Sequence, residues 1–366
     1  MIQHSGGRIL MKMKLKAFYL SALALAAFTA VGAAQEINAA VYSAPVSSQS
    51  VSQARLVPCG TPFGIKMLTD GVVVTDFGYV NGSVSQNSPA ETAGVKIGDV
   101  ITAVNGKSVF TSEELTAAVQ DDPEQCVISL LRSGEEMEIS AAPVISSEDG
   151  TYKIGLWTRD SCAGIGTMTF YDPETKIYGG LGHAVSDTST GQKLPLLEGE
   201  ITAVTITDVL KGSSGTPGEL CGAFVSDTKT GSVEINSEYG VFGYSETAPV
   251  LNEPLELAGK DEIKKGKATI YTTVAGMMPQ EYEIEIVKID KGSSSAVRNM
   301  TIRVTDRELL SRTGGIVQGM SGSPIIQNGK LIGAVTHVLV NDSAMGYGVF
   351  IENMYSAAAP LGNNFA

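Results

Sequence analysis

The chain has few of the residues on which metal and redox chemistry depend. Its 366 residues include three histidines, four cysteines and one tryptophan. None of the cysteines belongs to a C-x-x-C pair, so the sequence predicts no zinc site. We therefore expect neither a metal nor another cofactor.

Basic residues are also scarce relative to acidic ones. Lysine and arginine number 26 against 39 aspartates and glutamates, and the formal net charge is −13. Because phosphate binding needs a basic surface, we expect no nucleic-acid partner. Charge alone also disfavours adhesion to anionic lipid headgroups.

One apolar run near the N terminus is long enough to cross a bilayer. Three lysines precede the uncharged stretch AFYLSALALAAFTAVGAA at 17–34. A basic flank, an apolar stretch and a small-residue exit predict an export signal, cleaved after Ala34 or Ala40, or else retained as a membrane anchor. We expect an exported, extracytoplasmic protein with a signal or anchor segment over 1–34. A flexible Ser/Gln/Ala-rich linker over 35–55 then offers an easy proteolytic target.

Export would permit disulfide bonds between the four cysteines. One interpretation is that all four are small buried thiols. The other pairs them within each half of the chain, as Cys59–Cys126 and Cys162–Cys221. The sequence leaves both open, and no cysteine has a local context that suggests catalysis.

Residues 56–143 form the first predicted folded unit. Ser88 and Glu91 have capping-box spacing for a short helix, and Thr111 and Glu114 have it for a second helix. Between the two helices lie a short apolar strand and an Asn-Gly turn, and a hairpin follows the second helix. The unit is thus predicted to be a small mixed domain with two capped helices.

This order of parts resembles a PDZ domain of the bacterial protease-associated kind. The matching stretches are PFGIKM (62–67), SPAETAGVKIGDVITAVNG (88–106) and SEELTAAV (112–119). The resemblance implies a groove between a strand and the second helix, where a peptide adds to the sheet edge. Phe63, Gly64 and Ile65 would form the loop that binds a terminal carboxylate. Alternatively this stretch is only a strand entry, and the groove is unused or holds an internal segment.

Residues 151–356, after a polar joint at 144–150, are predicted to be mostly β. EYEIEIVKI alternates glutamates with apolar residues, as a half-buried strand does. Clusters of Gly, Ser, Thr and Asp recur between such strands, and TDRELLSR (305–312) is one short helix candidate. This pattern is typical of a barrel or sandwich.

A serine in this second unit has the surroundings of a nucleophile. Ser321 lies in GGIVQGMSGSPII (314–326), and glycines let the backbone turn its N–H groups toward an oxyanion at low steric cost. The N–H groups of Gly319 and Ser321 are the predicted donors. Ser323 is the rival nucleophile, but the proline after it indicates entry into the next strand.

Only two histidines remain as candidates for the general base, because His4 lies in the leader. His183 follows a glycine-rich loop, YGGLGH, whereas His337 lies in the apolar strand LIGAVTHVLV. We therefore predict that His183 accepts the proton of Ser321 and returns it to the leaving amine.

A carboxylate should hold the imidazole, and the residues alone leave three candidates open: Asp187, Asp306 and Asp342. A resemblance bears on the choice. GGLGHAVSDTSTG, VTDRELLSRTGGIVQGMSGSPIIQNGKLIGAVTHVLVND and GYGVFIE, behind a PDZ unit and a leader, resemble the stage IV sporulation protein B peptidases. The resemblance implies Ser321 as nucleophile, His183 as base and Asp306 as orienting acid, with Asp187 next.

This family of trypsin-like serine peptidases occurs in endospore-forming bacteria. The resemblance implies a mostly β chain, in which an N-terminal PDZ domain precedes a double β-barrel peptidase domain. It also implies a signalling protease, which is exported between the forespore and mother-cell membranes and cleaves itself near its N terminus. There it would cut a membrane-bound regulator of an intramembrane metalloprotease, and so release processing of the late mother-cell sigma factor precursor. The PDZ groove would hold a peptide C-terminus or an internal segment.

The strand after the nucleophile in trypsin-like folds lines the pocket for the residue before the scissile bond. His337 lies on that strand, so we consider it a candidate for contact with the substrate, against a purely structural role. Two other functions stay open. One is an exported PDZ quality-control protease, although its PDZ domain usually follows the protease domain. The other is a non-catalytic PDZ adaptor on a protease-like barrel.

Overall fold

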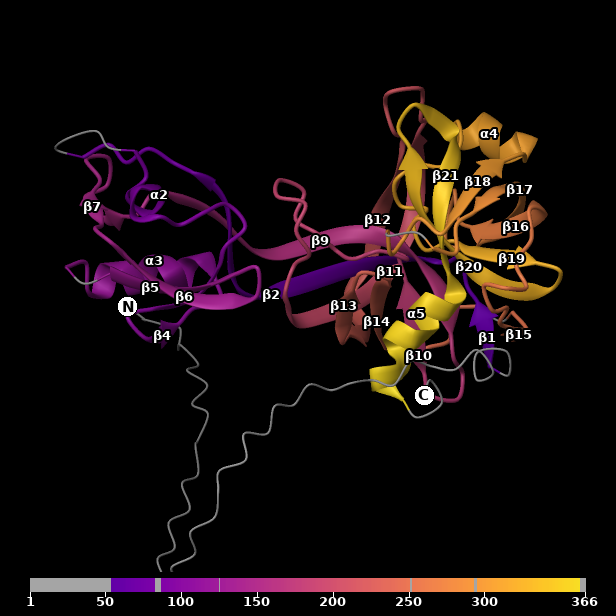
Figure 1. Ribbon diagram of the computed structural model, residues 1–366, viewed down its shortest axis with the longest axis horizontal. Helices are drawn as coiled ribbons and strands as arrows, with labels where there is room; N and C mark the ends of the chain where they lie inside the picture. The colour runs from indigo at the N-terminus through magenta and orange to yellow at the C-terminus, as the bar shows by residue number, and fades with distance from the viewer. Residues whose placement is uncertain (1–53, 83–86, 125, 251, 293–294, 363–366) are drawn as a thin grey trace, which may run out of the picture. The chain divides into compact units, whose positions relative to one another are not determined.

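The computed structural model describes residues 54–362, apart from 83–86, 125, 251 and 293–294. The predicted leader over 1–34 and nearly all of the linker over 35–55 lie outside the described residues. Within the described part of the chain, no helix is both long and apolar enough to cross a bilayer. Strands dominate, as the sequence predicts (Figure 1).

A closed barrel of six strands forms the C-terminal part, with the strand order β16-β17-β18-β21-β20-β19. Its elements, in chain order, are β16 (Gly266–Thr272), β17 (Gln280–Ile289), β18 (Met300–Val304), α4 (Arg307–Thr313), β19 (Pro324–Gln327), β20 (Lys330–Leu339) and β21 (Asp342–Phe350), followed by α5 (Ile351–Ala358) and the 3₁₀ turn η1 (Ala359–Leu361). The glutamates of β17 at 281, 283 and 285 face outward or lie half-buried, while Tyr282, Ile284 and Ile286 are buried. The period-two pattern thus places its apolar face in the barrel core.

Most of the other strands belong to a larger, open sheet. They are β1 (Arg55–Pro58), β2 (Pro62–Phe77), β9 (Leu156–Tyr171), β10 (Ile177–Gly180), β11 (Leu196–Leu210), β12 (Glu219–Val233), β13 (Ile235–Ser237), β14 (Gly240–Tyr244) and β15 (Leu255–Glu256). The sheet follows the order β13-β14-β10-β9-β2 and then continues into β3, β5 and β6. The structure therefore has one closed barrel and one open half-barrel, whereas the resemblance implied two barrels.

The first predicted unit contains the two predicted helices between short strands. Its elements are α2 (Pro89–Ala93), β3 (Val100–Val104), β4 (Lys107–Ser108), α3 (Ser112–Asp121), β5 (Cys126–Arg132), β6 (Glu135–Ala141), β7 (Val144–Ile145) and β8 (Tyr152–Lys153). Thr111 and Glu114 form the predicted capping box of α3. Ser88 caps α2 by accepting the Glu91 N–H, and Gly94 ends that helix in the left-handed conformation.

The prediction that Phe63, Gly64 and Ile65 form a carboxylate-binding loop is wrong. Phe63, Gly64 and Ile65 lie inside β2, paired on one side with β9 and on the other with β11. Phe63 and Ile65 are buried, so their backbone N–H groups belong to a sheet interior rather than to an open loop. The first half of β2 thus packs with strands of the second predicted unit, and its second half pairs with β3 of the first. An apolar strand pattern indicates burial but not the partner strand, which explains the error.

All four cysteines are free thiols. Burial raises the pKa of Cys126 to about 11, with a smaller contribution from the charge of Asp122. Burial also raises the pKa of Cys162, although Arg159 partly opposes the shift. These thiols are therefore poor nucleophiles at neutral pH.

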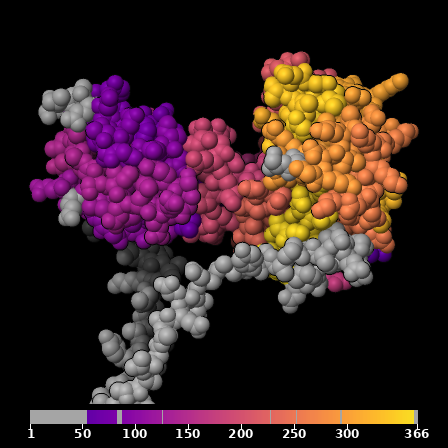
Figure 2. All heavy atoms as spheres, in the orientation of Figure 1, coloured from indigo at the N-terminus to yellow at the C-terminus, as the bar shows by residue number. Residues whose placement is uncertain are grey.

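The β11–β12 hairpin reaches the closed barrel through its tip. The Gly215 N–H donates to the Val340 carbonyl, the Ser214 hydroxyl donates to the Asn341 carbonyl, and the Gly212 N–H donates to the Thr313 carbonyl. Figure 2 shows the tip against the yellow atoms of β20 and β21 at the top of the view. The hairpin therefore covers the edge of the barrel that carries the candidate nucleophile.

Candidate active site

Ser321 lies in the loop between α4 and β19, at a turn that two glycines make possible. Gly319 and Gly322 have φ values of +94° and +98°, which side-chain-bearing residues rarely adopt. A Cβ atom on Gly322 would lie 1.9 Å from the carbonyl oxygen of Thr167, a backbone atom that cannot move away easily. The glycines around Ser321 are thus required by the local path of the chain.

Thr167, on β9, holds this loop in place. Its hydroxyl donates to the Gly319 carbonyl at 2.7 Å, and its N–H donates to the Ser321 carbonyl at 3.1 Å. Among the hydrogen bonds of the described residues, none uses the N–H of Gly319 or of Ser321. These are the two donors that the sequence predicts for an oxyanion hole, and both residues line the cavity described next.

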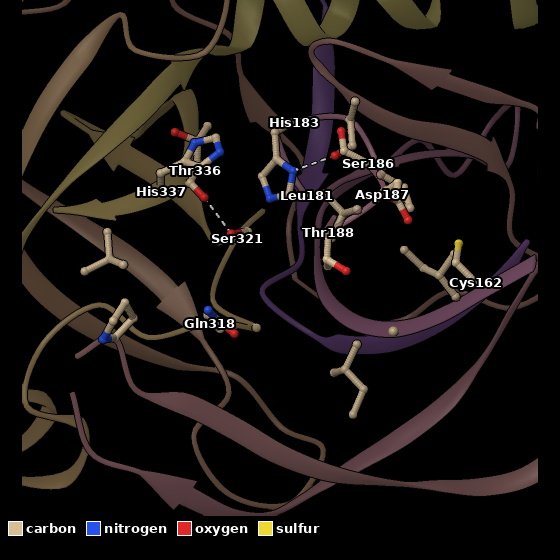
Figure 3. A pocket seen from close by; sticks show the side chains of 18 of the residues that line it. Cys162, Leu181, His183, Ser186, Asp187, Thr188, Gln318, Ser321, Thr336 and His337 are labelled. Atoms are coloured by element: carbon tan, nitrogen blue, oxygen red, sulfur yellow. Dashed lines mark hydrogen bonds between the residues drawn. The ribbon is translucent and has the colours of Figure 1, made fainter. Parts of the chain in front are cut away.

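Ser321 and His183 line one cavity of about 530 Å³. The Ser321 hydroxyl donates to the Thr336 carbonyl at 2.5 Å (Figure 3). Figure 3 shows His183 and Ser321 facing the same space, with Thr336 and His337 on one side and Cys162, Asp187 and Thr188 on the other. In this arrangement the hydroxyl is held by a backbone carbonyl, and a side-chain rotation would free it for the imidazole.

His183 follows β10 in a loop with two left-handed residues, Leu181 and Gly182. Its Nδ1 lies 2.8 Å from the Ala184 carbonyl oxygen. Because a carbonyl only accepts, Nδ1 carries the proton and Nε2 is left as the acceptor. Burial lowers the pKa of His183, and the bond to Ala184 opposes this only in part. A neutral imidazole with a free Nε2 is the form that a general base needs.

His337 lies next to His183, with ring centroids 4.8 Å apart. Burial, then the charge of His183, then that of Arg298 lower the pKa of His337 to about 4. Its Nδ1 is buried without a hydrogen-bond partner among the described residues. His337 therefore lines the cavity as a neutral side chain, and contact with the substrate stays a prediction.

The structure does not bring Asp306 to this cavity. Asp306 is the N-cap of α4, where its carboxylate accepts the N–H of Leu309 at 2.9 Å and that of Glu283 at 3.4 Å. The stretch TDRELL has the residues of a helix start, and this local role explains its aspartate. Among the hydrogen bonds of the described residues, none joins Asp306 to His183, and its role as orienting acid stays a prediction.

Asp187 does line the cavity, but other groups occupy its carboxylate. It accepts the N–H groups of Ser189 and Thr190, and its Oδ2 lies 2.6 Å from Arg159 Nε. Burial alone would raise the pKa of Asp187, but the Thr190 and Ser189 hydrogen bonds and the Arg159 charge outweigh it and lower the pKa. Asp342, the third candidate, accepts the N–H of Ala344 and does not line the cavity.

Two groups that the sequence analysis missed position the histidine loop. The Ala184 carbonyl takes the place expected for a carboxylate at Nδ1. Asn236, on β13, accepts the N–H of Val185 at 2.9 Å and donates to the carbonyls of Val185 and Leu194. A carbonyl has no sequence signal, and Asn236 lies 53 residues from His183, so local patterns could not identify either.

Two family models match the chain. The model of the SpoIVB peptidase S55 family matches residues 150–355, and a PDZ domain model matches residues 82–132. The chain belongs to the SpoIVB peptidase S55 family. It is a serine peptidase in which a PDZ domain precedes a mostly β peptidase domain, as the sequence analysis expected. The PDZ match begins well after residue 56, in agreement with the packing of the first half of β2 among peptidase strands.

Curated relatives match shorter stretches. The chain is 43% identical over 75 residues to the zinc metalloprotease RasP of Shouchella clausii, which is 20% of this chain and 17% of that protein. It is 38% identical over 63 residues to RasP of Oceanobacillus iheyensis, 17% of this chain and 15% of that protein. The chain thus spans less than a fifth of the length of these relatives.

One solved structure among the similar ones is an inactive mutant of Rv3671c from M. tuberculosis H37Rv. It is 14% identical to this chain, with a TM-score of 0.32, and the match covers 54% of this chain and 82% of the other.

Among the described residues, no cluster of three or more His, Cys, Asp or Glu side chains could hold a metal ion.

Proposed function

We propose that this peptidase is exported, cleaves itself within residues 35–55, and then cuts a membrane-bound regulator of an intramembrane protease during sporulation. In that sequence of events, cleavage of the regulator leads to processing of the late mother-cell sigma factor precursor. Membership of the SpoIVB peptidase family supports the signalling role. The PDZ domain supports the binding of a protein substrate through a peptide segment.

The chemistry assigned to the site starts with His183. Its Nε2 accepts the proton of the Ser321 hydroxyl once that hydroxyl leaves the Thr336 carbonyl. The Ser321 oxygen then attacks the scissile carbonyl, and the N–H groups of Gly319 and Ser321 bind the oxyanion that forms. The protonated His183 returns its proton to the leaving amine, and water completes hydrolysis of the acyl-enzyme by the same route.

One observation carries the catalytic assignment. The hydroxyl of Ser321, a neutral imidazole with a free Nε2 and two unpaired N–H groups border the same cavity. In the Ser-His-Asp mechanism a carboxylate holds the histidine tautomer. Here the Ala184 carbonyl meets that requirement without a charge.

The test is expression of the full chain with export intact, as the parent and as Ser321→Ala and Ser323→Ala variants. Mass spectrometry of the N termini should find a new terminus within 35–55 for the parent and for Ser323→Ala, and none for Ser321→Ala. Processing that persists in Ser321→Ala would overturn the assignment. A fluorophosphonate probe should label Ser321, whereas a non-catalytic adaptor would leave it unlabelled.

Substrate range is tested separately with the same proteins. A signalling protease should digest casein poorly and cut a membrane-embedded regulator at one site. Rapid and general digestion of casein would instead support a quality-control protease.

A further inference from the structure

We propose that the part of the cavity between residues 316–319 and 336–340 binds the substrate side chain that precedes the scissile bond, and that it selects an uncharged aliphatic residue. This inference rests on the proposed role of Ser321 as nucleophile. It goes further, because it names the substrate class from the walls of the site.

The position of the substrate residue follows from three backbone constraints. Its carbonyl carbon must lie beside the Ser321 hydroxyl, and its carbonyl oxygen must lie at the N–H groups of Gly319 and Ser321. Its own N–H then faces the Thr336 carbonyl, the acceptor that the Ser321 hydroxyl uses in the free protein.

Strand β20 has an open edge at this position. Its pairing with β19 ends at Pro324 and Ala334, and the N–H and carbonyl of Val335 bind Ser323 and Gly322. The Thr336 carbonyl on this edge accepts the Ser321 hydroxyl, and the Val340 carbonyl accepts the Gly215 N–H of the β11–β12 hairpin. We infer that an extended peptide pairs with β20 between these two points. The side chain of the bound residue is therefore directed between β20 and the segment that leads to Gly319.

The walls of this slot are mostly apolar, although Gln318 and Thr336 also line the cavity. Of the residues that line the cavity, those on this side with aliphatic or pyrrolidine side chains are Pro217, Ile316, Val317, Val338 and Val340. Ile316 and Val317 are buried in the barrel core, and Val338 packs against it. A charged side chain in such a slot would lose hydration without gaining a partner.

The charged groups of the cavity are occupied elsewhere. Arg159 and Asp187 pair with each other at 2.6 Å, and Asp187 lies on the Cys162 side of His183 in Figure 3. Among the described residues that line the slot, none is Asp, Glu, Lys or Arg. His337 borders it, and the low pKa of about 4 keeps that ring neutral near pH 7.

We infer that Ile316, which is buried and lines the cavity, limits the depth of the slot. The Ile316 Cδ1 atom lies 2.4 Å from the position that a Cβ on Gly346 would occupy, so this side chain fills the space above Gly346. Gly346 pairs with Val338 across β20 and β21. On this inference the slot accepts an aliphatic side chain of valine or leucine size better than a large aromatic ring.

The experiment uses the full chain and a set of peptides that span its own cleavage site. Only the residue before the scissile bond varies among Ala, Val, Leu, Phe, Lys and Glu. We expect kcat/KM to be at least about a hundredfold higher for Val or Leu than for Lys or Glu, because a desolvated charge has no partner in the slot.

Two variants probe the walls, each with a matched control. Ile316→Val removes one methylene at the floor and should raise relative cleavage of the Phe peptide about tenfold or more. Ile332→Val makes the same change in the same core but outside the cavity, and should leave the profile unchanged. Val340→Glu, at a side chain 54% exposed, should raise cleavage of the Lys peptide about fivefold. Val225→Glu, at a side chain 53% exposed on β12, should not.

Fluorophosphonate labelling separates this inference from the proposed function. If Ser321 is labelled and peptides are cut, but Lys or Glu peptides are cut as fast as Leu peptides, the slot assignment is wrong and the protease assignment stands. The same conclusion follows if neither wall variant changes the profile. If Ser321 is neither labelled nor needed for cleavage, both assignments fail together.

Discussion

Asp306 provides the sharpest test of the structure, because its two possible roles predict effects of very different size. As the N-cap of α4 it contributes to folding: removing such a cap costs about 1 kcal/mol, within a range of about 0.5–2 kcal/mol. Its negative charge at the helix start adds about 0.3–1 kcal/mol. As the orienting acid of a triad, its neutralisation to Asn would instead lower kcat about 10⁴-fold.

Three variants separate the two roles. Asp306→Ser keeps a good cap and removes the carboxylate, Asp306→Asn keeps the cap and the shape, and Asp306→Ala removes both functions. From the structure we expect Asp306→Ala to lower the free energy of unfolding by about 1–2 kcal/mol. We expect Asp306→Ser and Asp306→Asn to stay within about 0.5 kcal/mol of the parent.

The assay combines stability with rate per active site. Urea denaturation followed by circular dichroism gives the free energy of unfolding. Fluorophosphonate titration counts competent Ser321 sites, and cleavage of a fluorogenic peptide gives the rate per site. All three variants should keep the parent rate per site within about threefold. The His183→Ala variant, which lacks the general base, is the control that shows how large the loss of rate is when a catalytic residue is removed. If Asp306→Ser or Asp306→Asn is as stable as the parent but slower by about 10³-fold or more, the structural reasoning is refuted.

Three further predictions concern the surroundings of the nucleophile. Because burial lowers the pKa of His183, the rate should be flat near pH 7 and fall as the pH drops through a value below 6.5; a half-maximal rate above pH 6.5 in a pH–rate profile would contradict this. Gly322→Ala should abolish fluorophosphonate labelling of Ser321, because the new Cβ would lie 1.9 Å from the Thr167 carbonyl oxygen. Gly329→Ala is the control: Gly329 also has a positive φ but has open space around it, so this variant should lower the free energy of unfolding by about 1 kcal/mol and keep the labelling. Asn236→Ala, which removes three hydrogen bonds to the His183 loop, should lower kcat more than it changes KM; an unchanged kcat in steady-state kinetics would show that the loop does not need this support.

Helix starts were predictable because their determinants are local. Thr111 and Glu114 specify the cap of α3 within four residues, and Ser88 does the same for α2. The same chemistry explains why Asp306 fits two roles. An aspartate before a helical stretch satisfies the pattern of a cap and the pattern of a family motif at once, and the sequence cannot distinguish them.

Strand partners were not predictable, because pairing is decided between segments far apart in the chain. The PDZ resemblance implied a carboxylate-binding loop at Phe63, Gly64 and Ile65, with a strand entry as the alternative. Their positions between β9 and β11 depend on residues about 100 and 140 positions away. The placement of Asn236 beside the His183 loop has the same origin.

The sequence by itself determined which groups are chemically able to act: a serine among glycines and a histidine after a glycine loop. It also determined the β-rich class, since alternation and turn residues act over a few positions. Only the tertiary structure decided which groups meet. It brought Ser321 and His183 to one cavity, gave the histidine a backbone carbonyl instead of Asp306, and lined the neighbouring slot with aliphatic side chains. The physical reason is that covalent spacing constrains neighbours along the chain, whereas contacts across a barrel depend on how its strands pair and close.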